Sequence, residues 1–480
     1  MIQRRSMIVI FLIFLFITSI APVSLEAVTQ SDPQELDDDG PWLLFLAALE
    51  DETFPYLWGI NADGSGLTQL STQPVLNFAV NPYTQSYTGG HLVAYVGTST
   101  DNLRQGLSLY FLSLPDGGIS DPIPLTSAET SFHPDDDDSS GVGADEKLQV
   151  ATGLAYTQNL LWSPDGQWLA FIGAMNGPSL DLYSYELATG TVRWLTDGPS
   201  HAYQLLWTKD SSQIIHSAAI CFACAGGDYE SGQGIWGATP EGSALVTYEE
   251  AAAARFIVWK DASHLLMDSG PRNGEMGAAR ILDIANNQID PVHLGAFGPI
   301  AYNDTGSHTV LYSYGDTELL TEGRGLYLVD IDSQEATFLM DMYADIWWDH
   351  HNQRFLFSGD LGFFSITTNG MLTPFAAPTS QVSSPDERSI TWFDNMPREQ
   401  WGGELWLQNG EGEFAKMLDF GGLDMEWSPD SQSFFYDIGQ PGLYLVVAET
   451  MEVIPLFNES DLLVEWPFST LGWQATWISE

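Results

Sequence analysis

The sequence contains few basic residues: 15 Lys and Arg stand against 64 Asp and Glu, and the formal net charge at pH 7 is −49. A field of that sign repels phosphate backbones and anionic lipid. We therefore predict no nucleic-acid partner. Two interpretations of the acidity stay open: attraction of cations or basic ligands, and hydration of the surface in salty or acidic surroundings.

Cysteine is almost absent, since Cys221 and Cys224 are the two thiols of the chain. A zinc site normally has four ligands, and neither a second Cys pair nor a His cluster completes the set. A thioredoxin-like role would need a βαβ context that this sequence lacks. We predict a short-range disulfide that tightens a loop, with a redox role, free thiols or an unexpected metal as alternatives.

Long apolar runs are also missing, except for residues 7–20, which follow Arg4 and Arg5 and precede a stretch of small residues. This run is shorter than the ~20 residues of a spanning helix. The pattern is typical of a secretory signal. We predict a signal peptide at 1–27, a flexible acidic leader at 28–40, no integral membrane segment after cleavage, and a secreted or periplasmic protein.

Signatures of catalysis are missing as well. The sequence has no Gly-x-Ser-x-Gly elbow and no phosphate-cradling glycine-rich loop between a strand and a helix. Its carboxylates are too numerous to single out a glycosidase pair. Most of the 17 Trp fall on expected strand positions. We predict no catalytic residues.

A repeated hairpin is the main positive feature. Apolar residues 160–162 precede Ser-Pro-Asp-Gly at 163–166, and a second apolar run follows at once. Proline presets φ, and Asp and Gly accept a tight reversal, so this is a hairpin. Two further strands end near Thr196. Four strands in about 40 residues are typical of one propeller blade.

Copies of this hairpin recur at intervals of 43 to 52 residues, at Trp207, Trp259, Tyr302 and Trp348. A later copy at Trp427 repeats the first sequence almost unchanged. The combination resembles the TolB-type propeller repeats, WD-like units marked by W-S-P-D-G, over roughly residues 41–480. The resemblance implies a propeller and is nearly silent about activity, because that family spans partner-binding domains, substrate-gating domains of peptidases and a few enzymes.

The first unit lacks an opening strand, because 42–46 reads as a second strand. The missing strand is available at the end of the chain, at 462–466 or 473–478. We predict an all-β fold: a single propeller of four-stranded blades over 41–480, closed by a C-terminal strand that joins the N-terminal blade. We expect about eight blades, seven to nine, with two smaller propellers as the alternative.

One face of this ring collects most of the long loops, and such loops usually carry binding functions. The insertions are 98–105, 127–156, 221–234, 269–277, 315–325 and 395–403. Loop position alone marks four candidate binding residues on this face, namely Tyr229, Arg272, Arg398 and Trp401.

The longest insertion, an acidic segment near 127–157, invites a calcium interpretation. Asp136, Asp138 and Ser140 imitate the start of an EF-hand loop, but Lys147 occupies the twelfth position, where a bidentate Glu is needed. We predict a solvated acidic loop with neither a metal nor a cofactor, and keep calcium as a weak alternative. The segment 349–352, Asp-His-His-Asn, replaces a hairpin turn and is interpreted as a plain turn.

The sequence therefore favours an exported, non-catalytic β-propeller that binds a protein, peptide or glycan partner through its loop-rich face. Two alternatives remain. One is a metal-dependent propeller enzyme of the polysaccharide lyase or hydrolase type, and the other is a structural component of a cell-envelope complex.

Overall fold

A computed structural model gives the fold of the chain. It describes residues 36, 40–49, 54–83, 90–98, 106–127, 150, 153–154, 160–177, 179–198, 200–222, 229–249, 255–268, 279–292, 294, 297–315, 322–349, 353–359, 361–375, 381–394, 404–418, 424–437, 442–457 and 475–478.

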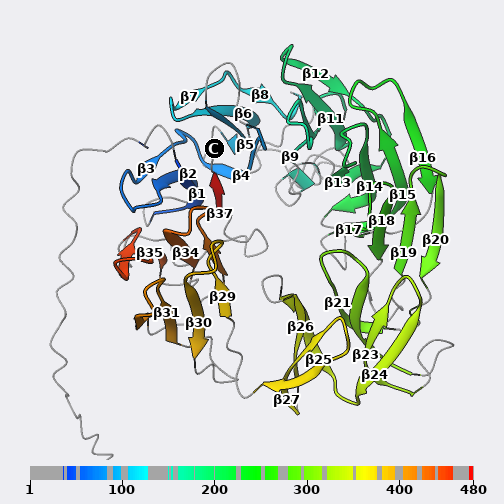
Figure 1. Ribbon diagram of the computed structural model, residues 1–480. Helices are drawn as coiled ribbons and strands as arrows, with labels where there is room; N and C mark the ends of the chain where they lie inside the picture. The colour runs from blue at the N-terminus through cyan, green and yellow to red at the C-terminus, as the bar shows by residue number, and fades with distance from the viewer. Residues whose placement is uncertain are drawn as a thin grey trace, which may run out of the picture.

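The described residues form nine antiparallel sheets, which we call blades 1 to 9, arranged as a ring (Figure 1). Blade 1 contains β1 (Trp42–Ala47), β2 (Tyr56–Asn61), β3 (Thr68–Gln69) and β37 (Ala475–Ile478). Blade 2 contains β4 (Val75–Val80), β5 (His91–Thr98), β6 (Leu107–Leu114), β7 (Gly118–Ile119) and β8 (Ile123–Pro124). Blade 3 contains β9 (Leu160–Trp162), β10 (Trp168–Gly173), β11 (Asp181–Glu186) and β12 (Thr191–Trp194).

Blades 4 to 9 follow the same plan of four consecutive strands. Blade 4 contains β13 (His201–Trp207), β14 (Ile214–Phe222), β15 (Tyr229–Ala238) and β16 (Leu245–Glu249). Blade 5 contains β17 (Arg255–Trp259), β18 (His264–Asp268), β19 (Ala279–Asp283) and β20 (Gln288–Val292). Blade 6 contains β21 (Phe297–Tyr302), β22 (His308–Ser313), β23 (Gly325–Asp330) and β24 (Glu335–Met340).

The last three blades complete the ring. Blade 7 contains β25 (Ala344–Asp349), β26 (Arg354–Gly359), β27 (Gly362–Thr367) and β28 (Leu372–Phe375). Blade 8 contains β29 (Gln381–Ser383), β30 (Ile390–Asp394), β31 (Glu404–Gln408) and β32 (Phe414–Leu418). Blade 9 contains β33 (Asp424–Trp427), β34 (Ser433–Asp437), β35 (Leu443–Val447) and β36 (Glu452–Pro455). The predicted single all-β propeller is confirmed, and its nine blades lie at the upper end of the predicted range.

The ring is closed by β37, which pairs antiparallel with β1 from Trp42↔Ile478 to Phe45↔Ala475. The indole nitrogen of Trp477 also donates to the carbonyl oxygen of Glu426 in blade 9, at 3.1 Å. Closure by the end of the chain is therefore confirmed, with 475–478 as the closing strand. The other candidate, 462–466, lies outside the described residues.

The Ser-Pro-Asp-Gly turn has a structural role. Ser163 is fully buried, and its Oγ donates to Asp165 Oδ1 at 2.6 Å while accepting from the Trp168 backbone nitrogen at 3.0 Å. Ser428 repeats both contacts with Asp430 and Ser433 in blade 9, at 2.6 and 3.1 Å. These bonds satisfy backbone groups where a hairpin enters the core. The motif is therefore structural, because its hydroxyl and carboxylate groups form hydrogen bonds within the turn.

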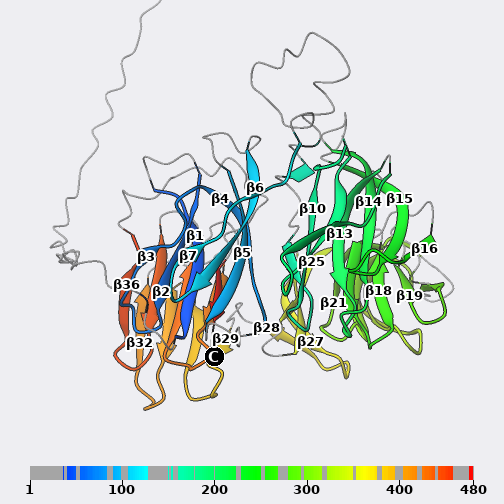
Figure 2. The same ribbon diagram turned by 90° about the horizontal axis from the view of Figure 1, so that it is seen from above.

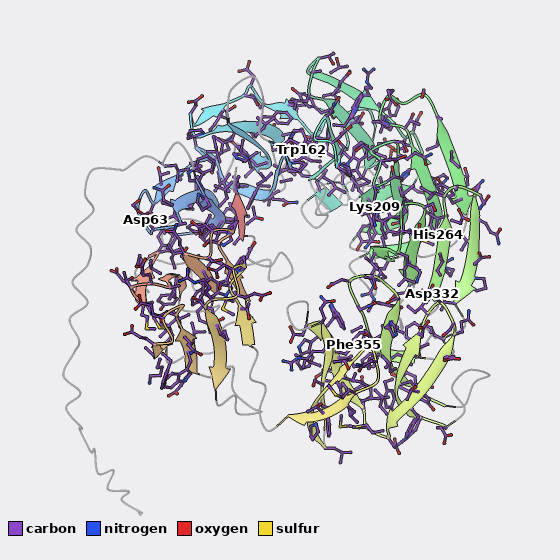
Figure 3. The ribbon with its side chains drawn as sticks, viewed as in Figure 1. Asp63, Trp162, Lys209, His264, Asp332 and Phe355 are labelled. Carbon is purple, nitrogen blue, oxygen red and sulfur yellow. The ribbon has the colours of Figure 1, made fainter. Side chains whose placement is uncertain are left out.

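Tryptophans of the innermost strands link neighbouring blades. The indole nitrogen of Trp162 donates to the Ala79 carbonyl at 3.1 Å, that of Trp207 to Leu161 at 2.8 Å, and that of Trp259 to Trp207 at 2.9 Å. Each bond crosses from one blade to the preceding one. Figure 3 labels Trp162 at the inner side of blade 3. The repeated tryptophan therefore serves both the core and the blade-to-blade contact.

Apolar clusters fill the spaces between blades. Within the described parts of the chain, shared clusters join all neighbouring blades except 7 and 8. The largest of them extends over blades 2, 3 and 4 and includes Phe111, Trp162 and Trp207. Burial of such side chains stabilises a fold by about 1.5–3 kcal/mol each. The core of this protein is therefore a set of apolar clusters between neighbouring blades around the ring.

The strands run from one face of the ring to the other (Figure 2). Because successive strands are antiparallel, the first-to-second and third-to-fourth turns of every blade lie on one face, which we call the turn face. The second-to-third loops and the blade connections lie on the opposite loop face. One predicted insertion is wrong: β14 and β15 extend as far as Phe222↔Tyr229, so the 221–234 loop shrinks to 223–228.

Candidate binding site on the loop face

The structure describes little of the residues predicted from loop position. Tyr229 is the first residue of β15 and Cys221 lies near the end of β14, where it pairs with Glu230. Only the backbone of these two residues is described. The other predicted site residues lie outside the described residues: Arg272, Arg398, Trp401, Cys224, Asp136, Asp138 and Ser140. The predicted contacts, disulfide and calcium loop all stay predictions.

The described residues contain no group of three or more His, Cys, Asp or Glu placed to hold a metal ion. The described part of the chain also contains no helix long and apolar enough to cross a membrane.

The loop face carries an exposed group of aromatic side chains at blades 6 and 7. Tyr314 and Tyr343 are 58% and 56% exposed, and both pack edge-to-face on the buried Tyr312, with ring centroids 5.4 and 5.0 Å from it. Leu361, 65% exposed, follows β26, and its backbone nitrogen lies 3.4 Å from Met342 Sδ. We call Tyr312, Tyr314, Tyr343 and Leu361 the tyrosine patch.

Three different segments supply the tyrosine patch. Tyr314 follows β22, Tyr343 lies between β24 and β25, and Leu361 lies between β26 and β27. Tyr312 belongs to the apolar cluster that joins blades 6 and 7, so this ring is anchored in the core. A Cβ at Gly298 would lie 2.7 Å from Tyr314 Oη, so the absent side chain leaves room for the Tyr314 ring. The patch is thus held on a rigid seam between two blades.

The charge around the tyrosine patch is acidic. Asp341 and Asp345 are exposed and stand two residues before and two residues after Tyr343. Among the described residues, one basic side chain lies close to Asp341 in space, that of Arg324, whose Nε lies 3.4 Å from Asp341 Oδ1. The 315–325 loop adds Glu322 among its described residues. The exposed rings therefore lie in a region where carboxylates outnumber cations.

A second group of polar side chains lies inside the loop-face end of blade 3. Asp181, only 1% exposed, accepts from Ser179 Oγ at 3.1 Å and from Thr196 Oγ1 at 3.2 Å. The buried His201 accepts from the Leu180 backbone nitrogen through Nδ1, at 3.1 Å. These bonds join the start of β11 to the segment that leads into blade 4.

Burial governs the ionisation of this group. Desolvation raises the pKa of Asp181 to about 6, against the hydrogen bonds from Ser179 and Thr196 that lower it. Desolvation, followed by the charge of Asp181, raises the pKa of Tyr183 to about 12. Burial lowers the pKa of His201. A carboxyl that titrates near neutrality is a property of many catalytic acids, although structural networks produce it too.

The turn face presents several ion pairs beside its own exposed aromatic side chains, Tyr83 and Phe414. His264 Nδ1 lies 2.8 Å from Asp261 Oδ2, and Lys260 Nζ lies 2.9 Å from Asp332 Oδ1, which links blades 5 and 6. Figure 3 labels His264 and Asp332 on these neighbouring blades. Hydrogen bonds to Ser263 and His264 hold the pKa of Asp261 low, at about 2. These contacts close the turns.

Sequence reasoning missed the tyrosine patch. The 315–325 insertion is visible in the sequence, and Tyr314 stands directly before it. The alternation Tyr312, Ser313, Tyr314 at the end of a strand is compatible with one buried and one exposed ring, but only the packed blades show which is which.

Taken together, the fold and the exposed patch define a ring-shaped β-propeller with a candidate binding surface on its loop face. No family model matches the chain. One curated protein, described as "Uncharacterized peptidase YuxL" of Bacillus subtilis (strain 168), is 37% identical over 59 residues. That segment is 12% of this chain and 9% of the peptidase, so the chain spans less than a tenth of that relative's length.

Solved structures similar to this chain are propellers of low identity. A eukaryotic initiation factor aligns over 91% of this chain and 98% of its own, with a TM-score of 0.50 and 13% identity. TolB from Acinetobacter baumannii covers 79% and 63% (TM-score 0.27, 14% identity). Oligogalacturonate lyase from Vibrio parahaemolyticus covers 80% and 86% (TM-score 0.34, 11% identity). The β-propeller predicted from the repeats is confirmed as a fold by the nine sheets of the described residues. This fold is compatible with both binding and enzymatic functions.

Proposed function

We propose that this protein is an exported, non-catalytic β-propeller that binds a partner protein, peptide or glycan through its loop face. The observation that carries the proposal is the pair of half-exposed rings, Tyr314 and Tyr343, held against the buried Tyr312. Tyrosine offers a large contact area at a small loss of conformational entropy, and it is enriched in binding surfaces. Export is proposed from the N-terminal pattern of a basic head and a short apolar run.

The rest of the molecule supports a scaffold role. The described turns are closed by their own side chains, and the inner strands are linked by indole hydrogen bonds. A rigid ring positions loop-face groups without reorganisation on binding, which lowers the entropy loss of association.

The test uses a defined set of immobilised probes: a lysine-rich peptide, a glutamate-rich peptide, a neutral β-glucan oligosaccharide and polygalacturonate. Binding of the intact protein is compared with that of Y314L/Y343L and of Y83L. Tyr83 is a matched control, because it is 54% exposed but lies in the β4–β5 turn on the opposite face. We expect the loop-face variant alone to lose binding to at least one probe. Equal binding by all three proteins would overturn the proposal.

A metal-dependent polysaccharide lyase or hydrolase is the second candidate, because the propeller fold is compatible with enzymes as well as with binding domains. The carboxyl with the raised pKa, Asp181, is 1% exposed and does not face solvent, so it is not assigned a catalytic role. Incubation with the same oligosaccharide and polygalacturonate, followed by analysis of the products, tests it. Turnover of either saccharide by the intact protein would replace the binding proposal with this one.

A further inference from the structure

We infer that the tyrosine patch recognises a cation, the lysine or arginine side chain of a basic peptide segment, which lies against the rings of Tyr314 and Tyr343. This inference rests on the proposed function and names the chemistry of the partner. The same patch would also suit a neutral glycan, and the experiment below separates the two.

The geometry of the rings is the first argument. Tyr314 and Tyr343 make interplanar angles of 80° and 70° with the ring of Tyr312, at centroid distances of 5.4 and 5.0 Å. Two half-exposed tyrosines thus pack against one buried tyrosine ring. An aromatic face is electron-rich and attracts a cation within about 6 Å of its centroid. Two exposed rings on one support offer two such faces.

The local charge is the second argument. Asp341 and Asp345 flank Tyr343 in the chain, both are exposed, and Arg324 already pairs with Asp341 at 3.4 Å. Carboxylates beside aromatic rings favour a cation and disfavour an anionic ligand. A neutral sugar would gain contact area from the rings and hydrogen bonds from its hydroxyl groups to the carboxylates, but no charge attraction.

The charge of the whole chain is the third argument. A net charge of −49 draws basic ligands toward the surface and repels polyanions. This long-range attraction does not select a place on the molecule. The exposed rings do, because Tyr314 and Tyr343 both pack edge-to-face on the same buried ring of Tyr312. The exposed Phe414 makes a single tilted contact with Trp406, at 6.5 Å between centroids.

The experiment measures fluorescence anisotropy with a short labelled peptide that carries two lysines and with its twin acetylated on both lysines. The proteins are the wild type, Y314L/Y343L, Y314F/Y343F and the turn-face control Y83L. Each ring is expected to contribute about two- to five-fold in affinity. Y314L/Y343L should therefore bind the lysine peptide about 5- to 20-fold more weakly, whereas Y314F/Y343F and Y83L should stay close to wild type.

The acetylated twin should bind the wild type weakly, because acetylation removes the cation and keeps most of the apolar stem. Asp345→Asn should weaken the lysine peptide about two-fold, and more at low than at high salt. Asp116→Asn, which changes an exposed carboxylate on the turn face, is the matched control and should change affinity less.

Three results would overturn the inference. The first is equal binding of the peptide and its acetylated twin, and the second is equal binding of the lysine peptide by the wild type and Y314L/Y343L. The third is a neutral oligosaccharide that depends on the tyrosines while the lysine peptide does not. This third result would leave the proposed function standing with a glycan as partner, whereas no dependence of any probe on the tyrosines removes both. Circular dichroism of each variant shows that the exposed substitutions keep the fold.

Discussion

The two faces of the ring differ in how their polar and aromatic groups are used. On the turn face, side chains bond within a hairpin or to the next hairpin: Asn81 Nδ2 donates to the Gly166 carbonyl at 2.8 Å, and the Asp386 nitrogen donates to Ser431 Oγ at 3.0 Å. On the loop face, Tyr314 and Tyr343 leave more than half of their surface in solvent. The bonds of the turn face hold neighbouring blades together, whereas the loop face places two exposed tyrosines on one buried ring.

This difference predicts that stability and binding separate by face. Substitutions in the turns and the inner strands should lower the free energy of unfolding and leave the affinity of the folded molecules unchanged. Substitutions in the tyrosine patch should do the reverse, because its exposed rings bury little on folding.

The largest effect is expected for Trp207, which is buried between two neighbouring blades. Its indole nitrogen donates to the Leu161 carbonyl, and its backbone carbonyl accepts from the Trp259 indole. Trp207→Ala should lower the free energy of unfolding by about 3–5 kcal/mol. Trp207→Phe keeps most of the apolar volume but removes the donor, and should lose about 1–2 kcal/mol. Urea titration measures both. An alanine variant as stable as the phenylalanine variant would contradict the blade-linking role.

The next largest effect concerns pH and tests whether Asp181 is an internal group of the loop-face end. Its folded pKa of about 6 lies above the unfolded value of 3.8, so the folded state holds more protons between these values. The contribution of Asp181 to the free energy of unfolding is therefore most favourable below about pH 4, and it is lost as the pH rises through 6. Asp181→Asn should gain about 3 kcal/mol relative to wild type between pH 4 and pH 7.

Histidines act in the opposite direction and sharpen this measurement. Burial lowers the pKa of His216 to about 4 and also lowers that of His201, so the folded state holds fewer protons than the unfolded chain below pH 6.5. Their contribution is lost as the pH falls. In D181N the stability should rise steadily from pH 4 to 6.5, whereas the wild type should show a flatter profile. Profiles that differ by a constant amount at every pH would refute the burial of Asp181 as the cause.

A smaller effect is expected for the turn serines. Ser428 is fully buried, and its Oγ both donates to Asp430 and accepts from the Ser433 nitrogen. Ser428→Ala should lower the free energy of unfolding by about 1–3 kcal/mol, because it leaves a buried backbone donor without a partner. The exposed Ser333 in the β23–β24 turn is the control, and its alanine variant should stay within about 0.5 kcal/mol. Equal losses in chemical denaturation would count against the turn network.

The smallest effect is expected at the fourth turn position. Glu387 adopts φ 59°, a left-handed conformation that Gly166 occupies at φ 67° in blade 3. Glu387→Gly should raise the free energy of unfolding by about 0.5–1 kcal/mol, because glycine adopts this conformation without strain. The greater conformational entropy of glycine in the unfolded chain offsets part of the gain. Gly166→Ala is the matched reverse, where a Cβ would also approach Asn81 Oδ1 to 2.5 Å. Thermal unfolding compares the two, and an E387G protein less stable than wild type would refute this account.

Much of the fold could be predicted because blade turns are local. The Ser-Pro-Asp-Gly turn at 163–166 and its repeats form hydrogen bonds within a few residues, so each hairpin can be recognised from a short segment of sequence. The blade count is harder to predict: the repeats favour eight, and the blade beyond that number takes its strands from both ends of the chain. The predicted 221–234 loop is wrong because β14 and β15 stay paired as far as Phe222 and Tyr229, although the sequence there is rich in glycine.

The candidate site could not be predicted to the same degree. Tyr312 and Tyr314 look alike in sequence, yet one is 5% and the other 58% exposed. Which ring is covered depends on blade 7, which packs against Tyr312 from another part of the chain. The patch lies on the face that loop length favoured, but loop length did not point to its residues.

By itself, the sequence determined the repeating hairpin and the acidic net charge, because each depends on residues close together in the chain or on composition. It offered two segments for the strand that closes the ring, and the structure has 475–478 in that place. Only the tertiary structure decided the number of blades, the burial of Asp181 and the exposure of Tyr314 and Tyr343. Those properties arise where one blade meets the next, and the contacts that set them join segments far apart in the chain.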